Sequence, residues 1–146
     1  TLLKSKADIA VTIDKEWEGY WRARNEDPLD DAETLKLRED GTISEIGQKP
    51  KSIAEIEGQY IGLMKFSEKG IKLVRDTFHA VIKNCELQSK TMENAYMTDL
   101  LQTMINLEIK VASVPVSDNW IEVDTVSDFS SDVTLKRLQK IHANLD

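Results

Sequence analysis

The chain has 146 residues, 40% of them hydrophobic and 31% charged, and a formal net charge of −7. This length and composition are typical of one folded domain with its own core, so we predict a single domain over residues 1–146 and exclude a disordered chain. The excess of acidic residues argues against a nucleic-acid surface, because phosphate backbones are bound by clustered Lys and Arg. Small anionic ligands stay open.

Cysteine content and hydropathy indicate in which cellular compartment the protein is expected. The single cysteine, Cys85, falls in a predicted helix and excludes an internal disulfide framework and a thiolate zinc cluster, which is typical of a reducing compartment. The apolar runs are only a few residues long, so we expect no membrane span and no secretory signal. We therefore expect a cytoplasmic protein.

The first part of the chain predicts a strand followed by a short helix. The opening residues, TLLKSKA, are typical of the last turns of a helix, since no capping residue precedes their leucines. Residues 7–14 alternate β-branched side chains, which predicts a strand. Residues 15–24 then place aromatic side chains and an arginine at helical spacing, at Trp17, Tyr20, Trp21 and Arg24.

The middle of the chain predicts a hairpin, a helical turn and a strand. Residues 33–48 alternate on both sides of an Asp-Gly pair at 40–41, and this pair supplies the positive backbone angles of tight hairpins. Ser52–Glu55 matches a capping box, so we expect one or two helical turns that Gly58 ends in a left-handed conformation. Residues 58–67 indicate a central strand.

The second half predicts three helices and a strand. Ser67 can cap a helix whose apolar stripe is Ile71, Val74, Phe78 and Val81. A second helix, around residues 97–107, carries Leu100, Leu101, Met104 and Ile105. Residues 108–116 predict a strand that Pro115 confines to a sheet edge or a bulge. Residues 130–146 predict an amphipathic helix through Leu135, Leu138 and Ile141. Strands that alternate with helices, plus one hairpin insertion, predict an α/β fold.

The segment Asn119–Phe129, NWIEVDTVSDF, has two interpretations. Glu122 and Asp124 interrupt an apolar run that is typical of a buried strand, immediately before the start of a predicted helix. One interpretation is capping, because Thr125 and Asp128 have the spacing of a helix-opening box. The other is a metal site, with Asp124 holding an ion at the mouth of a sheet. From the residues alone capping is the commoner role.

Five segments in order carry a resemblance to a known family: DKEWEGYWRARNEDPLDDAETLKL, EIGQKP, IEGQYIGLMKFS, YMTDLLQTMI and NWIEVDTVSDF. Together they resemble the later portion of a bacterial nucleotidyltransferase of the phosphocholine and aminoalkylphosphonate cytidylyltransferase group, itself similar to sugar-nucleotide pyrophosphorylases. The resemblance implies the C-terminal part of a Rossmann-like domain. It also implies a nucleoside triphosphate, with CTP favoured, and a phosphorylated small acceptor that attacks the α-phosphorus and releases pyrophosphate.

The same resemblance implies that part of the family's machinery lies outside this chain. The Gly- and Arg-containing loop that cradles the triphosphate, the lysine near it and the first metal-binding aspartate have no matching position here. We therefore expect them in an amino-terminal portion, and expect residues 1–146 alone to be inactive. The expected partners are the nucleotide, the acceptor, and either this missing portion or a second copy of the chain.

A magnesium ligand is implied at Asp124. The resemblance matches Asp124 to the aspartate of the family's EVDT motif, which is its second magnesium ligand. Magnesium prefers hard oxygen ligands and keeps waters, so one or two carboxylates plus substrate phosphates suffice. Glu122 lies two residues earlier and would face the same side of a strand, where it could support the metal. Asp128 is expected to be a first-turn charge favoured by the helix dipole.

A cationic head group is implied by aromatic and acidic residues within the same motifs. Aromatic faces attract an ammonium group and carboxylates add charge or hydrogen bonds. The resemblance makes Trp21 and Tyr96 the best candidates for a cage. The other candidates are Asp31, Glu33, Asp99 and Trp120. Core packing remains the alternative for Trp21, and capping of a turn the alternative for Asp31 and Glu33.

Two other functions stay open. A hexose-1-phosphate nucleotidyltransferase would replace the cation cage with groups that hydrogen-bond sugar hydroxyls. A non-catalytic binding or assembly module would fit the missing triphosphate loop. A hydrolase triad has no support, since no nucleophile has a spaced His and acid and both histidines fall in predicted helices. The basic residues near the expected site, which could contact phosphate or simply be solvated, are Arg22, Arg24, Lys49 and Lys51.

Overall fold

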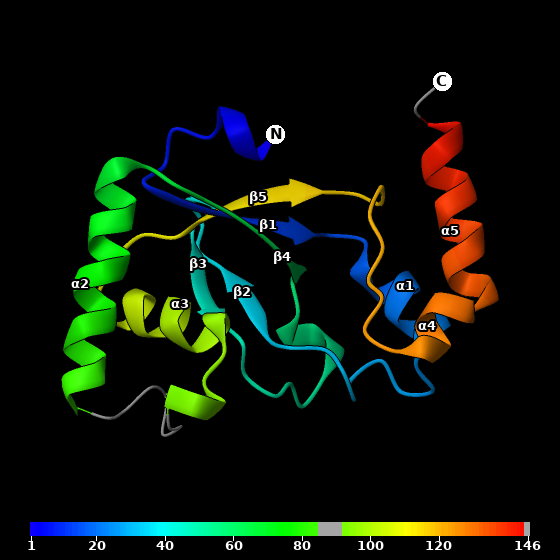
Figure 1. The fold of residues 1–146 in the computed structure, drawn as a ribbon, viewed down its shortest axis with the longest axis horizontal. Helices are drawn as coiled ribbons and strands as arrows, with labels where there is room; N and C mark the ends of the chain where they lie inside the picture. Colours follow the sequence, from blue (N-terminus) through cyan, green and yellow to red (C-terminus); the bar gives the residue numbers. More distant parts are fainter. Residues whose placement is uncertain (85–91, 145–146) are drawn as a thin grey trace.

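A computed structural model describes residues 1–84 and 92–144, in which a mixed sheet carries helices at both ends (Figure 1). Its three strands have the order β4-β1-β5. The central strand β1 (Ile9–Asp14) pairs antiparallel with β4 (Gln59–Phe66) and parallel with β5 (Ala112–Val116). This mixed α/β arrangement confirms the predicted fold class and is compatible with part of a Rossmann-like nucleotidyltransferase fold. Cys85, which was predicted to lie in a helix, falls outside the described residues.

The strand order corrects one prediction. Every residue of β1 is buried, because β1 has a strand on each side. The segment at 58–67 does form a strand, but β4 lies at an edge of the sheet and exposes residues in its middle. The hydrophobic run in β4 is as apolar as that of a central strand, and only the order of strands, which is set by non-local contacts, separates the two.

The hairpin and the helical turn after it form as predicted, with one exception. Strands β2 (Leu35–Leu37) and β3 (Ile43–Ile46) pair around Gly41, whose φ is +78°. A single 3-10 turn, η2, follows at Ile53–Glu55. Gly58 does not end this turn in a left-handed conformation; its role is close packing, since a Cβ there would lie 3.2 Å from the carbonyl oxygen of Asp14.

Two helices cover the sheet, and their buried faces agree in part with the predicted apolar stripes. Helix α2 (Glu68–Asn84) begins after Ser67, whose Oγ accepts a hydrogen bond from the Gly70 N–H at 3.0 Å. Ile71 was expected in its apolar stripe but is exposed, because the residue of the first turn that meets the sheet is its neighbour Gly70, where a Cβ would lie 3.4 Å from Cγ1 of Ile9. Helix α3 (Met97–Asn106) buries the four predicted apolar residues, Leu100, Leu101, Met104 and Ile105.

The C-terminal half of the fold departs more from expectation. The segment before Thr125 is not a strand, because Asp118 and Asn119 take positive φ angles of 53° and 61° that turn the chain away from β5. Two helices follow, α4 (Val126–Ser130) and α5 (Asp132–Ala143). Leu135 and Leu138 of α5 are exposed rather than buried, and the buried residue of this helix is Thr134.

Two hydrophobic clusters hold these elements together. The larger lies between the sheet, the hairpin, α2 and α3. The second is aromatic and centres on helix α1 (Trp17–Arg24), whose Trp17, Tyr20 and Trp21 are all buried.

β5 lies at the other edge of the sheet, as Pro115 predicts. Two short 3-10 turns complete the described elements, η1 (Leu2–Lys4), where helix turns were predicted, and η3 (Met92–Asn94).

No helix in the described ranges, 1–84 and 92–144, is both long and apolar enough to cross a membrane.

Candidate functional site

A cavity of about 510 Å³ lies where α1, β4, α3 and the segment before α4 meet. Its lining contains four carboxylates, three aromatic rings and no Lys or Arg among the described residues. Five predicted site residues line it, namely Trp21, Asp31, Glu33, Tyr96 and Asp124. The remaining lining residues are Gln59, Tyr60, Ile61, Gly62, Met97, Thr98 and Glu122. The structure therefore brings together residues more than 100 positions apart in the chain.

Two predicted site residues do not line the cavity but hold neighbours that do. Asp99 is buried, and its Oδ2 accepts the backbone N–H of Tyr96 at 2.7 Å in a capping box that opens α3. Trp120 donates its indole N–H to Asp14 at 2.8 Å and packs against Tyr20 and Trp21. Asp99 and Trp120 therefore hold the lining residues Tyr96 and Trp21 in place without lining the cavity themselves.

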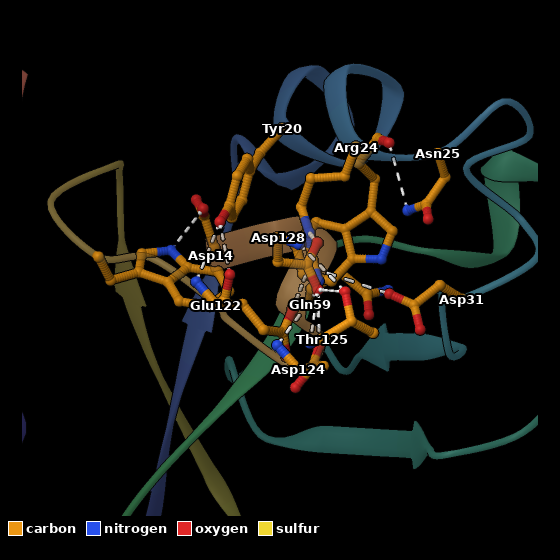
Figure 2. Close-up of polar contacts among 12 residues, drawn as sticks. Asp14, Tyr20, Arg24, Asn25, Asp31, Gln59, Glu122, Asp124, Thr125 and Asp128 are labelled. Atoms are coloured by element: carbon orange, nitrogen blue, oxygen red, sulfur yellow. Dashed lines mark hydrogen bonds and ion pairs between the residues drawn. The ribbon is translucent and has the colours of Figure 1, made fainter. Parts of the chain in front are cut away.

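Arg24 lies behind the acidic wall and was not recognised from the sequence as its centre. Its side chain is only 6% exposed, and its guanidinium nitrogens lie 2.6 Å from Glu122, 3.0 Å from Asp124, 3.4 Å from Asp128 and 4.0 Å from Asp31 (Figure 2). Burial lowers the pKa of Arg24, but the hydrogen bonds to these carboxylates outweigh it and raise the pKa overall. Arg24 is thus a structural cation, and Arg22 pairs with Glu18 on the surface.

The segment 117–125 has no regular secondary structure, yet side chains of α1 and α5 hold it in place. The Tyr20 hydroxyl accepts from the Glu122 N–H at 3.0 Å and donates to the Glu122 carbonyl oxygen at 3.2 Å. Arg137 donates to the Trp120 carbonyl oxygen at 2.7 Å while its guanidinium lies 3.8 Å from the centre of the Tyr20 ring. With Trp120 bound to Asp14, these contacts fix where Glu122 and Asp124 stand.

The capping interpretation of the NWIEVDTVSDF segment is confirmed for Thr125 and Asp128. The Thr125 hydroxyl accepts the Asp128 N–H at 3.1 Å, and the Asp128 carboxylate accepts the Thr125 N–H at 2.9 Å. The N-cap is Thr125 and not Asp124, whose exposed carboxylate accepts a hydrogen bond from Arg24. The cap therefore leaves Asp124 available for another role.

Burial and like charge shape the ionisation of the wall. Burial first, and then the charges of Asp124 and Asp31, raise the pKa of Glu122, with Arg24 opposing them. Burial also raises the pKa of Tyr60, and the negative charge of Glu33 adds to the effect. Carboxylates held this close favour a positive ligand, because a cation relieves their mutual repulsion.

Trp21 is a core residue as well as a lining residue. It is 3% exposed, and its ring packs against Trp17, Tyr20 and Trp120, with the Arg24 guanidinium 5.7 Å from its centre. Its indole N–H has no hydrogen-bond partner within the described residues, and the same holds for the hydroxyl of Thr98, which also lines the cavity. Such groups are uncommon in folded proteins.

The residues present fit magnesium only as part of a ligand set. Within the described residues no three His, Cys, Asp or Glu side chains are grouped to hold a metal ion. Asp124 offers a carboxylate that is 59% exposed, although one oxygen lies 3.0 Å from Arg24. A magnesium ion that keeps waters and substrate phosphates needs only one or two such carboxylates. Lys49, for which a phosphate contact and a solvated position were both left open, donates to the carbonyl oxygens of Leu29 and Asp30.

Comparison with known proteins supports the resemblance at the level of the family. The chain is 39% identical over 127 residues to the CTP:phosphoglutamine cytidylyltransferase of Campylobacter jejuni. The match covers 87% of this chain and 50% of that protein, so the chain spans half the length of this relative. No family model matches the chain. The similarity supports a cytidylyltransferase-like family for this chain.

Proposed function

We propose that this chain is the acceptor-binding part of a cytidylyltransferase that transfers CMP from CTP to a small phosphorylated acceptor with a cationic head group. The cavity carries the proposal, because it gathers four carboxylates and three aromatic rings without a lining Lys or Arg among the described residues. A cation is the ligand that such a wall stabilises. The similarity to a CTP-using relative supports the reaction class.

The charge of the wall suggests how the acceptor would be oriented. Its cationic head would lie against Asp31, Glu33 and Glu122, while repulsion would keep its phosphate away from these carboxylates. The phosphate oxygen would then point out of the cavity toward the α-phosphorus of CTP. A new P–O bond forms there as the bond to the leaving pyrophosphate breaks, and the contribution of these residues is positioning.

Magnesium is proposed as the cofactor, with Asp124 as one ligand and Glu122 in support. When bound, the ion would neutralise charge on the transferring phosphates. Arg24 and the Thr125 cap would hold Asp124 in place for this role. The other ligands would be waters, phosphate oxygens and groups outside this chain.

Several acceptors share the proposed chemistry. Phosphocholine and aminoalkyl phosphates or phosphonates each combine a cationic nitrogen with a phosphoryl group. Phosphoglutamine, which the relative's name gives as its acceptor, also carries an ammonium group. A hexose 1-phosphate lacks a cationic nitrogen, so it offers no positive charge to pair with the carboxylates of the wall.

The test uses the full-length polypeptide that contains this chain. Pyrophosphate release is measured with CTP, magnesium and each acceptor in turn, with UTP and glucose 1-phosphate as the matched alternatives. We expect release with CTP and a cationic acceptor at least about tenfold above release with CTP and glucose 1-phosphate, since one lost charge contact is worth more than about 1.4 kcal/mol. CTP should be preferred to UTP because the relative of this chain uses CTP. Preference for the sugar phosphate would support the hexose enzyme, and no release with any pair would support a binding module.

A further inference from the structure

The cavity offers few open aromatic faces for a cation. Trp21 is almost completely buried. Its ring packs against three aromatic rings, and the Arg24 guanidinium lies 5.7 Å from its centre. Trp120 packs against Tyr20 and lies outside the lining. The aromatic rings left at the cavity are the half-buried Tyr60 and the exposed Tyr96. A trimethylammonium group has no N–H and is held by π faces, so this cavity suits it poorly.

Hydrogen-bond acceptors, in contrast, are abundant. Asp31, Glu122 and Asp124 all line the cavity, and Arg24 donates N–H groups to Glu122 and Asp124 while its guanidinium lies 4.0 Å from Asp31. Four lining carboxylates outnumber this single buried cation, so the wall keeps an excess of negative charge. Ionised carboxylates accept several hydrogen bonds each, and a primary ammonium group donates three.

We propose that the cavity selects acceptors with a primary ammonium group over those with a quaternary one. This inference rests on the proposed function, because it names the class of acceptor that the same cavity takes. Each methyl group added to the nitrogen removes one N–H donor while the charge stays at +1, so affinity should fall along a methylation series.

Isothermal titration of the full-length protein tests this with four probes: phosphoethanolamine, its N-methyl and N,N-dimethyl forms, and phosphocholine. Each is titrated with and without a non-hydrolysable CTP analogue and magnesium. We expect Kd to rise at each methylation and by about tenfold or more over the series, as expected for lost charge-assisted hydrogen bonds. Equal affinity, tighter binding of phosphocholine, or binding of none of the four under either condition would overturn the inference.

Matched variants place the selectivity in this cavity. Glu33→Gln and, separately, Asp31→Asn should each reduce the Kd ratio between phosphocholine and phosphoethanolamine severalfold while the melting temperature stays close to that of the wild type. Asp76→Asn is the control, because Asp76 is an exposed carboxylate of α2 outside the cavity. An unchanged ratio in both cavity variants would place the preference elsewhere and overturn the assignment.

Turnover separates this inference from the proposed function. Selective binding of the primary ammonium without any pyrophosphate release from CTP would retain the selectivity and overturn the enzymatic proposal. Release of pyrophosphate with equal affinity for all four probes would do the reverse.

Discussion

A single buried guanidinium, that of Arg24, ties together carboxylates from three parts of the chain. Glu122, Asp124 and Asp128 each lie within 3.4 Å of it, and Asp31 lies at 4.0 Å. Without a cation at this point the wall would hold like charges close together with nothing to balance them. The acidic wall is therefore present before any ligand arrives, and Arg24 is the residue that permits it.

Arg24→Gln should destabilise the fold by about 3 kcal/mol, because it leaves partly buried carboxylates without their counter-ion. Urea denaturation measures the change. Arg22→Gln is the matched control, since Arg22 is on the same helix, is 54% exposed and forms a surface pair with Glu18. The control should cost less than about 0.5 kcal/mol. Equal effects of the two substitutions would contradict the structural role of Arg24.

Asp124→Asn separates a metal ligand from a structural residue. The substitution removes the charge but leaves the Thr125 and Asp128 cap intact, so the melting temperature should change little. In the full-length enzyme kcat should fall by a factor of about 100 or more, the range seen when electrostatic support for a developing charge is removed. Kinetics at increasing magnesium concentration, beside a melting curve, give both values. Unchanged kcat at ordinary magnesium would make Asp124 merely structural.

At the scale of elements, the hairpin supports the cavity through one close approach. Gly47 follows β3 with a φ of +81°, and a Cβ built there would lie 2.6 Å from Cβ of Thr98. Thr98 is in the first turn of α3 and lines the cavity. The hairpin thus packs directly against the helix start that carries Tyr96 and Thr98.

Gly47→Ala and Gly41→Ala form a matched pair for this contact. Both glycines have nearly the same positive φ, but a Cβ at Gly41 meets nothing within 4 Å. Gly41→Ala should therefore cost only the backbone strain, about 1 to 2 kcal/mol, whereas Gly47→Ala should cost clearly more because Thr98 must move. Chemical denaturation of the two variants gives the difference. Equal losses would show that the hairpin and α3 adjust without strain.

Local sequence patterns predicted where helices and strands form better than they predicted which residues are buried and how the strands are ordered. The alternation in β1, the Asp-Gly pair of the hairpin and the apolar spacing of α3 are set by neighbouring residues, and all three elements form where expected. Ile71 and Leu135 show the limit, because both are exposed while the preceding residue, Gly70 or Thr134, is buried. Apolar spacing alone does not say which face of a helix meets the rest of the fold. The edge position of β4 likewise depends on partners distant in sequence.

The sequence named residues that line the candidate site but not the residue that holds this lining in place. The motifs named Trp21, Asp31, Glu33 and Tyr96 as acceptor contacts and Asp124 as a metal ligand, and these five line one cavity, whereas the candidates Asp99 and Trp120 do not. The link through Arg24 was missed because its partner Glu122 is 98 residues away. One signal was present, since Arg24 continues the helical face of three buried aromatic residues, where an exposed arginine is not expected.

At the scale of the whole molecule, several carboxylates make stability depend on acidity. The hydrogen bond from Ser67 lowers the pKa of Asp8, that from Thr42 lowers the pKa of Asp40, and that from Lys140 lowers the pKa of Asp118. The Thr125 hydroxyl likewise lowers the pKa of Asp128. A folded pKa below the unfolded value contributes stability above the unfolded pKa, and this is lost as the pH falls through the folded pKa.

The free energy of unfolding should therefore decrease as the pH is lowered below about 4, the ordinary pKa of these side chains. Glu122 acts in the opposite direction, because its raised pKa means that protonation favours the folded state. Urea titrations over this pH range measure the sum, and Asp40→Asn should flatten the curve. Stability that is constant or higher at acid pH would contradict the hydrogen-bond and ion-pair pattern of the structure.

We propose that the acidic cavity binds the acceptor and not the nucleotide. This proposal is tested most directly by the two KM values of the full-length enzyme carrying Glu33→Gln, measured at saturating concentration of the other substrate. We predict that the acceptor KM rises about tenfold, as expected for one lost charge contact, while the CTP KM stays within about twofold of the wild type. A rise in the CTP KM with an unchanged acceptor KM would contradict the account.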